Sequence, residues 1–256
     1  LLFVLITLPQ SLPSPAFILA SARSVDQMDW HQPGWFIPWQ NSIQFLAPDF
    51  FGNPTTLNYS GVWNYAEFIG YIGIVPFFLS LAAIFSRRDK KTFFYVGVLL
   101  LSLLFAFPTV FAFLPFSLSV PFLSSSQPTR LLFLVDFALA VLSALGLDYL
   151  IKQKKAIWLP LVVGAICFAI MWAIVLFFPV FLSLTPEQLL VSKRNLWLPT
   201  LLFMVTVGMF LIHFRLSDKR VRYFVISVLC LITVFDLFRF TGKFLPFTDP
   251  HYLYPE

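Results

Sequence analysis

Five charged residues lie in or beside long apolar runs of this chain, where a charge is costly unless it has a partner or a water-filled cavity. Glu67 opens one run, Arg130 and Asp136 belong to a second, and Asp236 and Arg239 lie near the end of a third. At a helical rise of about 1.5 Å per residue, Asp136 and Asp236 each lie roughly 9 Å from the same end of their spans. We therefore predict one outward-facing polar cavity, lined by all five residues, for an anionic or polyhydroxylated ligand near the lipid surface.

A second interpretation is open for the same charges. Asp236 and Arg239 are spaced as an i, i+3 pair, and Asp136 is within reach of Arg130 or Arg239, so ion pairs of this kind would only hold helices together. Charges near the membrane boundary are also less costly, since long side chains reach the headgroup layer. Asp148 and Lys152 are different, because their i, i+4 spacing at a helix end predicts a solvated pair.

Other candidate residues carry weaker signals. Asp26 and Asp29 are possible catalytic carboxylates, although a solvated loop is the default interpretation of both. The sequence contains no metal motif, glycine-rich phosphate loop or nucleophile elbow, so no cofactor is evident. Cys167 and Cys230 lie in separate apolar runs, which predicts two packing residues and no disulfide.

The composition excludes a soluble globular domain. Hydrophobic residues make up 59% of the 256 residues, charged residues only 11%, and the mean hydropathy is +0.85. The net charge of +5 does not indicate a nucleic-acid partner, because the basic residues gather in short loops between apolar runs. Membrane lipid is the expected surrounding of a single polytopic transmembrane domain, residues 1–256.

The apolar runs predict an all-α bundle of about seven transmembrane spans. The first run contains three prolines, so its outer half is not expected to be a regular helix. The connector 114–121 is too apolar for a water-exposed loop and is predicted to be re-entrant or interfacial. The expected spans are 1–20, 66–85, 92–112, the apolar part of 120–155, 156–178, 196–214 and 223–240.

Loop charges predict how the spans are oriented. The loops 87–91, 152–155 and 215–222 are rich in Lys and Arg and alternate with loops that carry fewer basic residues. The positive-inside rule then places the richer loops in the cytoplasm. The aromatic-rich insertion 21–64, with a short interfacial helix predicted at 38–46, and the C-terminal segment 241–256 would both lie outside.

Three passages together resemble the YfhO family of bacterial membrane proteins. The first is LPQSLP at 8–13 followed by SAR at 21–23, and the second is APDFFG at 47–52 followed by EFIGYIG at 67–73. The third is QPTR at 127–130, which leads into an Ala- and Leu-rich helix ending in GLD at 146–148. Each motif alone is weak, and their order and spacing carry the resemblance up to about residue 150.

The resemblance implies a GT-C-like glycosyltransferase of the bacterial cytoplasmic membrane. Such an enzyme takes a sugar from a polyprenyl-phosphate carrier and transfers it to an acceptor, here an envelope polymer, on the outer face. Enzymes of this type usually carry their catalytic carboxylate in the first outer loop, and this chain is expected to be a fragment that begins after it and is inactive in isolation. The rival hypotheses are a transporter or flippase for a lipid-linked or anionic solute and a membrane scaffold without a site.

Overall fold

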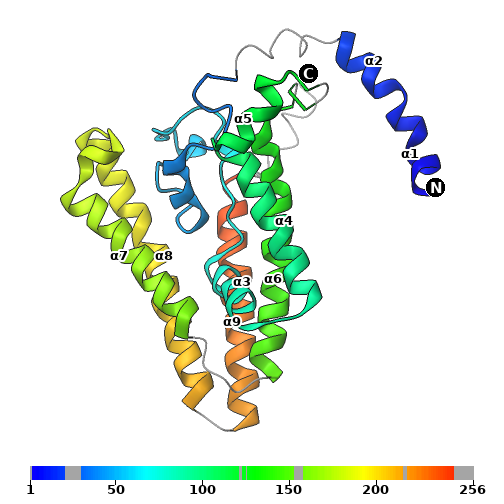
Figure 1. Cartoon of the computed structure of the whole chain (residues 1–256). Helices are drawn as coiled ribbons and strands as arrows, with labels where there is room; N and C mark the ends of the chain where they lie inside the picture. The colour runs from blue at the N-terminus through cyan, green and yellow to red at the C-terminus, as the bar shows by residue number, and fades with distance from the viewer. Residues whose placement is uncertain are drawn as a thin grey trace, which may run out of the picture.

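The computed structural model describes residues 2–20, 30–120, 123–124, 126–152, 158–215 and 218–244. These residues form an all-α structure (Figure 1). Its nine described α-helices are α1 (Leu2–Ser11), α2 (Pro13–Ala20), α3 (Ile74–Ser86), α4 (Lys90–Ala106), α5 (Val110–Ser117), α6 (Leu132–Lys152), α7 (Trp158–Phe177), α8 (Pro186–Arg215) and α9 (Lys219–Thr241). Short 3-10 helices connect them: η3 (Trp39–Phe45), η4 (Pro54–Thr56), η5 (Tyr65–Glu67), η6 (Pro128–Leu131) and η7 (Pro179–Leu182).

Helix α3 is the element that the rest of the bundle shares. It contacts α4, α6, α7, α8 and α9, and most of its side chains are buried, although it has only 13 residues. Its most extensive contact is with α6, and Gly146 permits that contact: a Cβ atom at this position would lie 1.9 Å from the carbonyl oxygen of Leu79. The two helix backbones therefore approach each other closely at Gly146.

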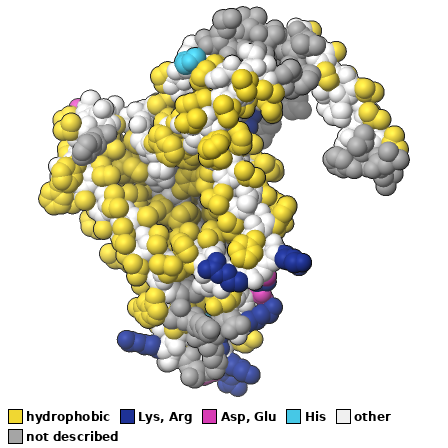
Figure 2. Space-filling model, viewed as in Figure 1, with side chains coloured by type: hydrophobic (Ala, Val, Ile, Leu, Met, Phe, Trp, Pro, Cys, Tyr) yellow, Lys and Arg dark blue, Asp and Glu magenta, His cyan; other side chains and the backbone are white. Residues whose placement is uncertain are grey.

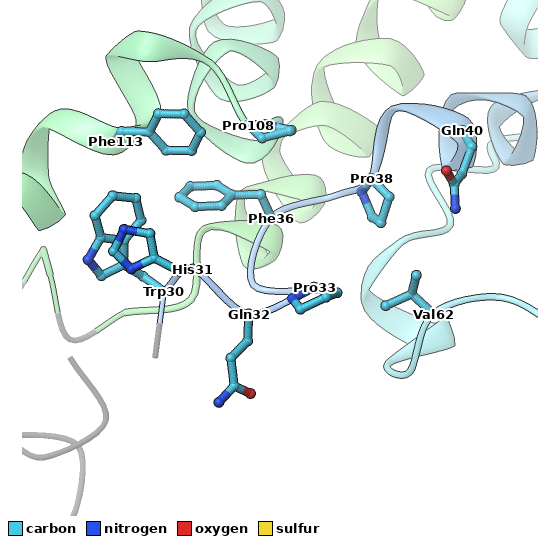
Figure 3. A pocket seen from close by; sticks show the side chains of 11 residues that line it. Trp30, His31, Gln32, Pro33, Phe36, Pro38, Gln40, Val62, Pro108 and Phe113 are labelled. Carbon is cyan, nitrogen blue, oxygen red and sulfur yellow. The ribbon is translucent and has the colours of Figure 1, made fainter. Parts of the chain in front are cut away.

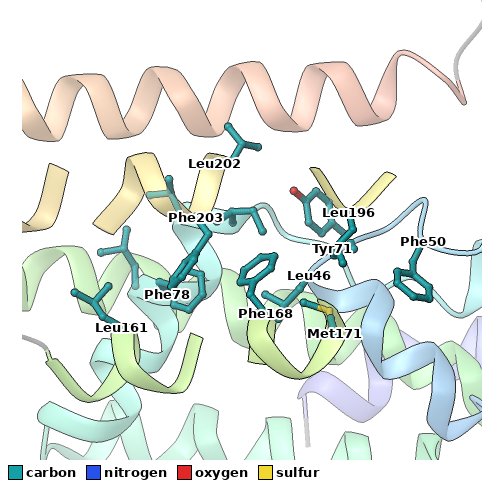
Figure 4. Packing of buried hydrophobic residues seen from close by; sticks show 14 of the residues in the cluster. Leu46, Phe50, Tyr71, Phe78, Leu161, Phe168, Met171, Leu196, Leu202 and Phe203 are labelled. Atoms are coloured by element: carbon teal, nitrogen blue, oxygen red, sulfur yellow. The ribbon is translucent and has the colours of Figure 1, made fainter. Parts of the chain in front are cut away.

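Aromatic side chains fill the space between α3 and the α7–α8 pair (Figure 4). The ring of Phe203 stacks on Phe168 at 4.9 Å between centroids and lies 4.8 Å from the ring of Phe78. Gly164 leaves room for this cluster, since an added Cβ would lie 2.2 Å from Phe78. The outer surface of the bundle is also apolar, with Phe133, Leu201 and Phe238 all more than half exposed, as expected of side chains that face lipid.

The prediction of seven spans is wrong. Among the described residues, four helical segments are long and apolar enough to cross a membrane, or five if the bent pair α4–α5 counts as one span. The four are Pro128–Lys152, Trp158–Phe177, Pro186–Arg215 and Lys219–Thr241. A multi-pass membrane protein is confirmed at this coarser level.

Two expected spans are absent and a third is bent, each for a different local reason. The run 1–20 is divided into α1 and α2 around Leu12, directly before Pro13, and in Figure 1 these two short helices stand apart from the bundle. The run 66–85 becomes a 13-residue helix, about 20 Å long, because Gly73 adopts φ +93° and the residues before it are not helical. In the third run α4 and α5 are bent by 63° around Pro108.

The apolar connector 114–121 begins inside α5, which ends at Ser117. Phe116 is buried against Phe36 and Ala112, whereas Leu114 and Leu118 are exposed, so the described part of this segment buries only part of its apolar surface. A broken span and a re-entrant loop are both compatible with the 63° bend between α4 and α5.

The described part of the aromatic-rich insertion covers one end of the bundle. The predicted short helix at 38–46 is confirmed as η3, and its polar side chains Asn41 and Gln44 are buried against the protein, where Asn41 Nδ2 donates to Gln44 Oε1 at 2.6 Å. The backbone N–H of Ile37 donates to the carbonyl of Ala106 at 2.9 Å, which fixes the insertion to the end of α4. Trp39 and Trp63 remain more than half exposed.

The basic loops meet at the opposite end of the molecule, where Lys and Arg side chains gather in Figure 2. Arg87 Nη1 in the α3–α4 loop pairs with Asp148 Oδ2 at 2.8 Å. Arg222 Nη2 at the start of α9 donates to the carbonyl of Ile151 at 3.3 Å. Both segments therefore contact the end of α6. The predicted pair of Asp148 and Lys152 is confirmed at 2.7 Å. Both cysteines are free; Cys167 is half-buried, whereas Cys230 is exposed, so the predicted packing role does not hold for Cys230.

Candidate functional site

Glu67 and Arg130 form an ion pair at the end of the bundle opposite the basic loops. Arg130 follows the proline that starts η6, and its Nε lies 3.4 Å from Glu67 Oε1. The same carboxylate accepts stronger hydrogen bonds from Thr129 Oγ1 at 2.5 Å and from Asn64 Nδ2 at 2.9 Å. Arg130 uses only its Nε in this contact, and no hydrogen bond among the described residues uses its two terminal amino groups.

The surroundings of Glu67 keep it ionised. Burial alone would raise the pKa of this carboxyl group, but the hydrogen bonds from Thr129 and Asn64 and the charge of Arg130 together hold the pKa below its usual value. Glu67 is therefore a carboxylate that holds the Nε of Arg130, while 56% of the Arg130 side chain stays exposed.

An apolar groove of about 510 Å³ begins beside Arg130. It lies between α5 and the start of α6, and its described lining includes three polar residues: Arg130, Gln127 and Ser126. The other described lining residues are apolar: Phe105, Ala112, Pro115, Phe116, Leu123, Pro128, Leu131 and Leu134. A largely apolar groove whose lining includes a guanidinium group has the chemistry to hold a hydrocarbon chain that carries an anionic head.

Asp236 lies in a second, separate polar cluster. It is 1% exposed, and its Oδ2 accepts hydrogen bonds from the Tyr71 hydroxyl at 2.6 Å and from the Ile74 N–H at 3.2 Å. Burial raises the pKa of the Tyr71 hydroxyl, and the nearby carboxylate of Asp236 raises it further, so this tyrosine is a stable proton donor. Asp236 thus fixes α9 to the first turn of α3.

The ion pairs that the alternative interpretation predicted are not among the contacts of the described residues. Asp236 Oδ1 and Arg239 Nε are both buried without a hydrogen-bond partner, although the two residues are one helical turn apart. Asp136 Oδ1 is also buried without one. Hydrogen bonds and ion pairs join Glu67 to Arg130, and none joins either of them to Asp136, Asp236 or Arg239 within the described part of the chain.

Asp49 is a polar centre that the sequence interpretation missed. This carboxylate is 6% exposed, forms an ion pair with Lys243, and accepts hydrogen bonds from Tyr65 at 3.0 Å and Asn53 at 2.9 Å. Its backbone carbonyl accepts a further bond from Asn195 Nδ2 at 2.6 Å. The signal was present in the sequence, since Asp49 is the one acidic residue between Gln44 and Glu67 in an apolar and aromatic stretch.

The Asp49 centre joins three parts of the chain. It connects the insertion to α8 through Asn195 and to the end of α9 through Lys243, and the ring of Phe244 stacks on Tyr65 at 5.4 Å. Burial raises the pKa of the Tyr65 hydroxyl, and the charge of Asp49 adds to this effect. Because Asn53, Tyr65, Asn195 and Lys243 from separate parts of the chain all bond to Asp49, its position is that of a structural anchor.

The candidate catalytic residues Asp26 and Asp29 lie outside the described residues. Within the described ranges, no group of three or more His, Cys, Asp or Glu side chains is arranged to hold a metal ion. Other described cavities also include Lys or Arg, but the groove beside Arg130 is the one on the side of the bundle opposite the basic loops, and its described lining is otherwise mostly apolar.

Comparison with known proteins gives no assignment. No protein-family model matches the chain, and no curated protein or solved structure matches it either. The resemblance to the YfhO family therefore gains no support from these searches. At the level they and the structure support, the chain is an all-α protein with four to five candidate membrane spans.

Proposed function

We propose that this chain is part of a membrane glycosyltransferase of the YfhO and GT-C type, which transfers a sugar from a polyprenyl-phosphate carrier to an envelope polymer on the outer face of the bacterial cytoplasmic membrane. The groove beside Arg130 is the observation that carries the proposal. A polyprenyl phosphate has a long hydrocarbon chain and an anionic head, and the groove offers an apolar path with a guanidinium group at its edge.

The volume and position of the groove support a lipid ligand. Its volume of about 510 Å³ is enough for several isoprene units, and Leu123 and Leu134 on its walls are also exposed at the bundle surface. A lipid could thus enter sideways from the bilayer without crossing a polar layer. The phosphate would then meet the free amino groups of Arg130, which Glu67 holds at the edge of the groove.

The separation of charges along the molecule supports the proposed orientation. The basic loops meet at one end, and the groove, Glu67 and the described insertion lie at the other. Under the positive-inside rule the basic end faces the cytoplasm, and the groove opens toward the outer leaflet.

The experiment is a transfer assay with the complete transferase of which we propose this chain is a part, reconstituted in vesicles, because the chain alone is expected to be inactive. We would supply a polyprenyl phosphate that carries one radiolabelled hexose, together with an envelope polymer fraction, and measure label in the polymer. Wild-type protein is expected to transfer label and Arg130→Ala to lose most of it. Arg194→Ala is the matched control, because Arg194 is an exposed arginine that lies outside the groove. Equal transfer by all three proteins, or by none, would overturn the proposal.

The 63° bend between α4 and α5 favours one alternative, a transporter or flippase for the same kind of lipid-linked solute. Broken helices that line a binding site are common in transporters. The same vesicles separate the two functions: a transporter would move the labelled lipid between leaflets and leave its sugar bond intact.

A further inference from the structure

A second cavity lies beside α5, on the side of the aromatic-rich insertion, and the Arg130 groove does not include it. Its volume is about 510 Å³. Figure 3 shows the rings of Trp30, Phe36 and Phe113 at one end and the amide of Gln40 at the other. The aromatic rings lie close together, with Phe36 and Phe113 at 5.2 Å and Trp30 and Phe113 at 5.5 Å between centroids.

The described polar groups of this cavity are uncharged amides and one imidazole. Gln32, Gln40 and His31 all line it, and none of its described lining residues is Lys, Arg, Asp or Glu. No hydrogen bond within the described residues uses the side-chain polar atoms of these three, and all three side chains are exposed. An amide offers both donors and acceptors, which suits a ligand rich in hydroxyl groups better than an anion.

The wall of the cavity is held in place before any ligand arrives. Gly34 adopts φ +93°, and an added Cβ would lie 2.9 Å from Trp63 Nε1. Trp63 Nε1 donates to the carbonyl of Pro33 at 2.8 Å, and Gln127 Nε2 donates to the carbonyl of Gly34 at 3.1 Å. A wall fixed from two sides loses little conformational entropy when a ligand binds.

The same hydrogen bond brings the two cavities together. Gln127 lines the Arg130 groove, and Gly34, which accepts its bond, lines the aromatic cavity. Helix α5 stands between them, with Phe113 on the aromatic cavity and Phe116 on the groove. A phosphate beside Arg130 would therefore have the aromatic cavity as its neighbour across one helix.

We propose that the aromatic cavity binds a neutral saccharide unit, with its C–H groups against the rings of Trp30, Phe36 and Phe113 and its hydroxyl groups on the amides of Gln32 and Gln40. Aromatic faces carry partial negative charge and attract the C–H groups of a sugar ring. The saccharide is either the sugar of a lipid-linked donor or part of a free glycan acceptor. This assignment rests on the proposed function only for the origin of the sugar.

Saturation-transfer NMR on the protein in nanodiscs would test the assignment. The probes are methyl glycosides of neutral hexoses, polyprenyl phosphate, and polyprenyl phosphate carrying one hexose. We expect transfer to the sugar protons, and a roughly three- to tenfold weaker affinity in Phe113→Ala and in Gln40→Ala. Phe111→Ala and Gln10→Ala are the controls, since each changes the same residue type at an exposed position outside the cavity.

The outcomes distinguish the source of the sugar and separate the two proposals. Binding of free glycosides indicates a glycan acceptor, and binding of the hexose only on its lipid carrier indicates the donor. The saccharide site would be overturned if polyprenyl phosphate binds equally well with and without its hexose and if Phe113→Ala changes neither affinity. This result would leave the proposal for the Arg130 groove intact. Sugar binding that depends on Phe113, together with no effect of Arg130→Ala on the carrier, would overturn the groove and keep the saccharide site.

Discussion

Replacement of Gly146 by alanine is expected to destabilise the protein by separating α3 from α6. The added Cβ would lie 1.9 Å from the carbonyl oxygen of Leu79 and 2.7 Å from its carbon, both of them backbone atoms that no rotamer change can move. Bringing the shorter contact to 3.0 Å requires a shift of about 1 Å between helices that form the largest contact of the bundle. Overpacking of this kind costs about 1–3 kcal/mol.

Two other glycines provide matched controls. Gly97 in α4 and Gly208 in α8 have no neighbouring atom within 4 Å of an added Cβ, so alanine there would keep only the gain in helix propensity, up to about 1 kcal/mol. Gly164→Ala tests the intermediate case, because the atoms that it would meet belong to the rings of Phe78 and Phe203, which can move.

Thermal unfolding of the purified variants in one detergent would measure these effects. We expect the midpoint of Gly146→Ala to fall by on the order of 5 °C, and the midpoints of Gly97→Ala and Gly208→Ala to remain equal to or above that of the wild type. A Gly146→Ala protein as stable as Gly97→Ala would refute the close contact of α3 and α6, and with it the central position of α3.

Two further predictions concern ion pairs. The hydrogen bond from Arg87 holds the pKa of Asp89 at about 2, below its usual 3.8, so the stabilisation from this carboxylate is complete above pH 4 and is lost as the pH falls toward 2. The thermal midpoints of the wild type and Asp89→Asn should therefore differ at neutral pH and converge near about pH 2. A difference that stays constant with pH would contradict the ion pair. Lys243→Met leaves the buried carboxylate of Asp49 without its cation and should cost on the order of 2 kcal/mol, a value between those of exposed and fully buried pairs. The double variant with Asp49→Asn should recover part of this loss, and additive losses in thermal unfolding would argue against direct contact.

The sequence predicted the features that depend on composition and on local spacing. The length of the apolar runs predicted a membrane protein and the helices α6 to α9. The i, i+4 spacing predicted the pair of Asp148 and Lys152. The failures concern apolar stretches whose role depends on tertiary contacts. Helix α3 is a buried core element of 13 residues, and its sequence is as apolar as that of a span, so hydropathy alone could not separate the two.

The candidate site shows the same division. Glu67 and Arg130 were both placed near the outer boundary by their positions in the sequence, and the structure brings them into contact. Asp49 and Lys243, which are 194 residues apart, could not be paired by any local rule, because their contact depends on how α9 packs against the insertion. The groove was equally hidden, since it arises from the bend between α4 and α5.

The affinity of the reconstituted protein for polyprenyl phosphate, compared between the wild type and Arg130→Ala, tests the central claim most directly. A charge-assisted hydrogen bond to phosphate is worth about 1.5–3 kcal/mol, so Arg130→Ala should bind the lipid roughly 10- to 100-fold more weakly, while Arg194→Ala should bind it as the wild type does. Equal affinity in all three proteins would contradict the assignment of the groove as a lipid-phosphate site.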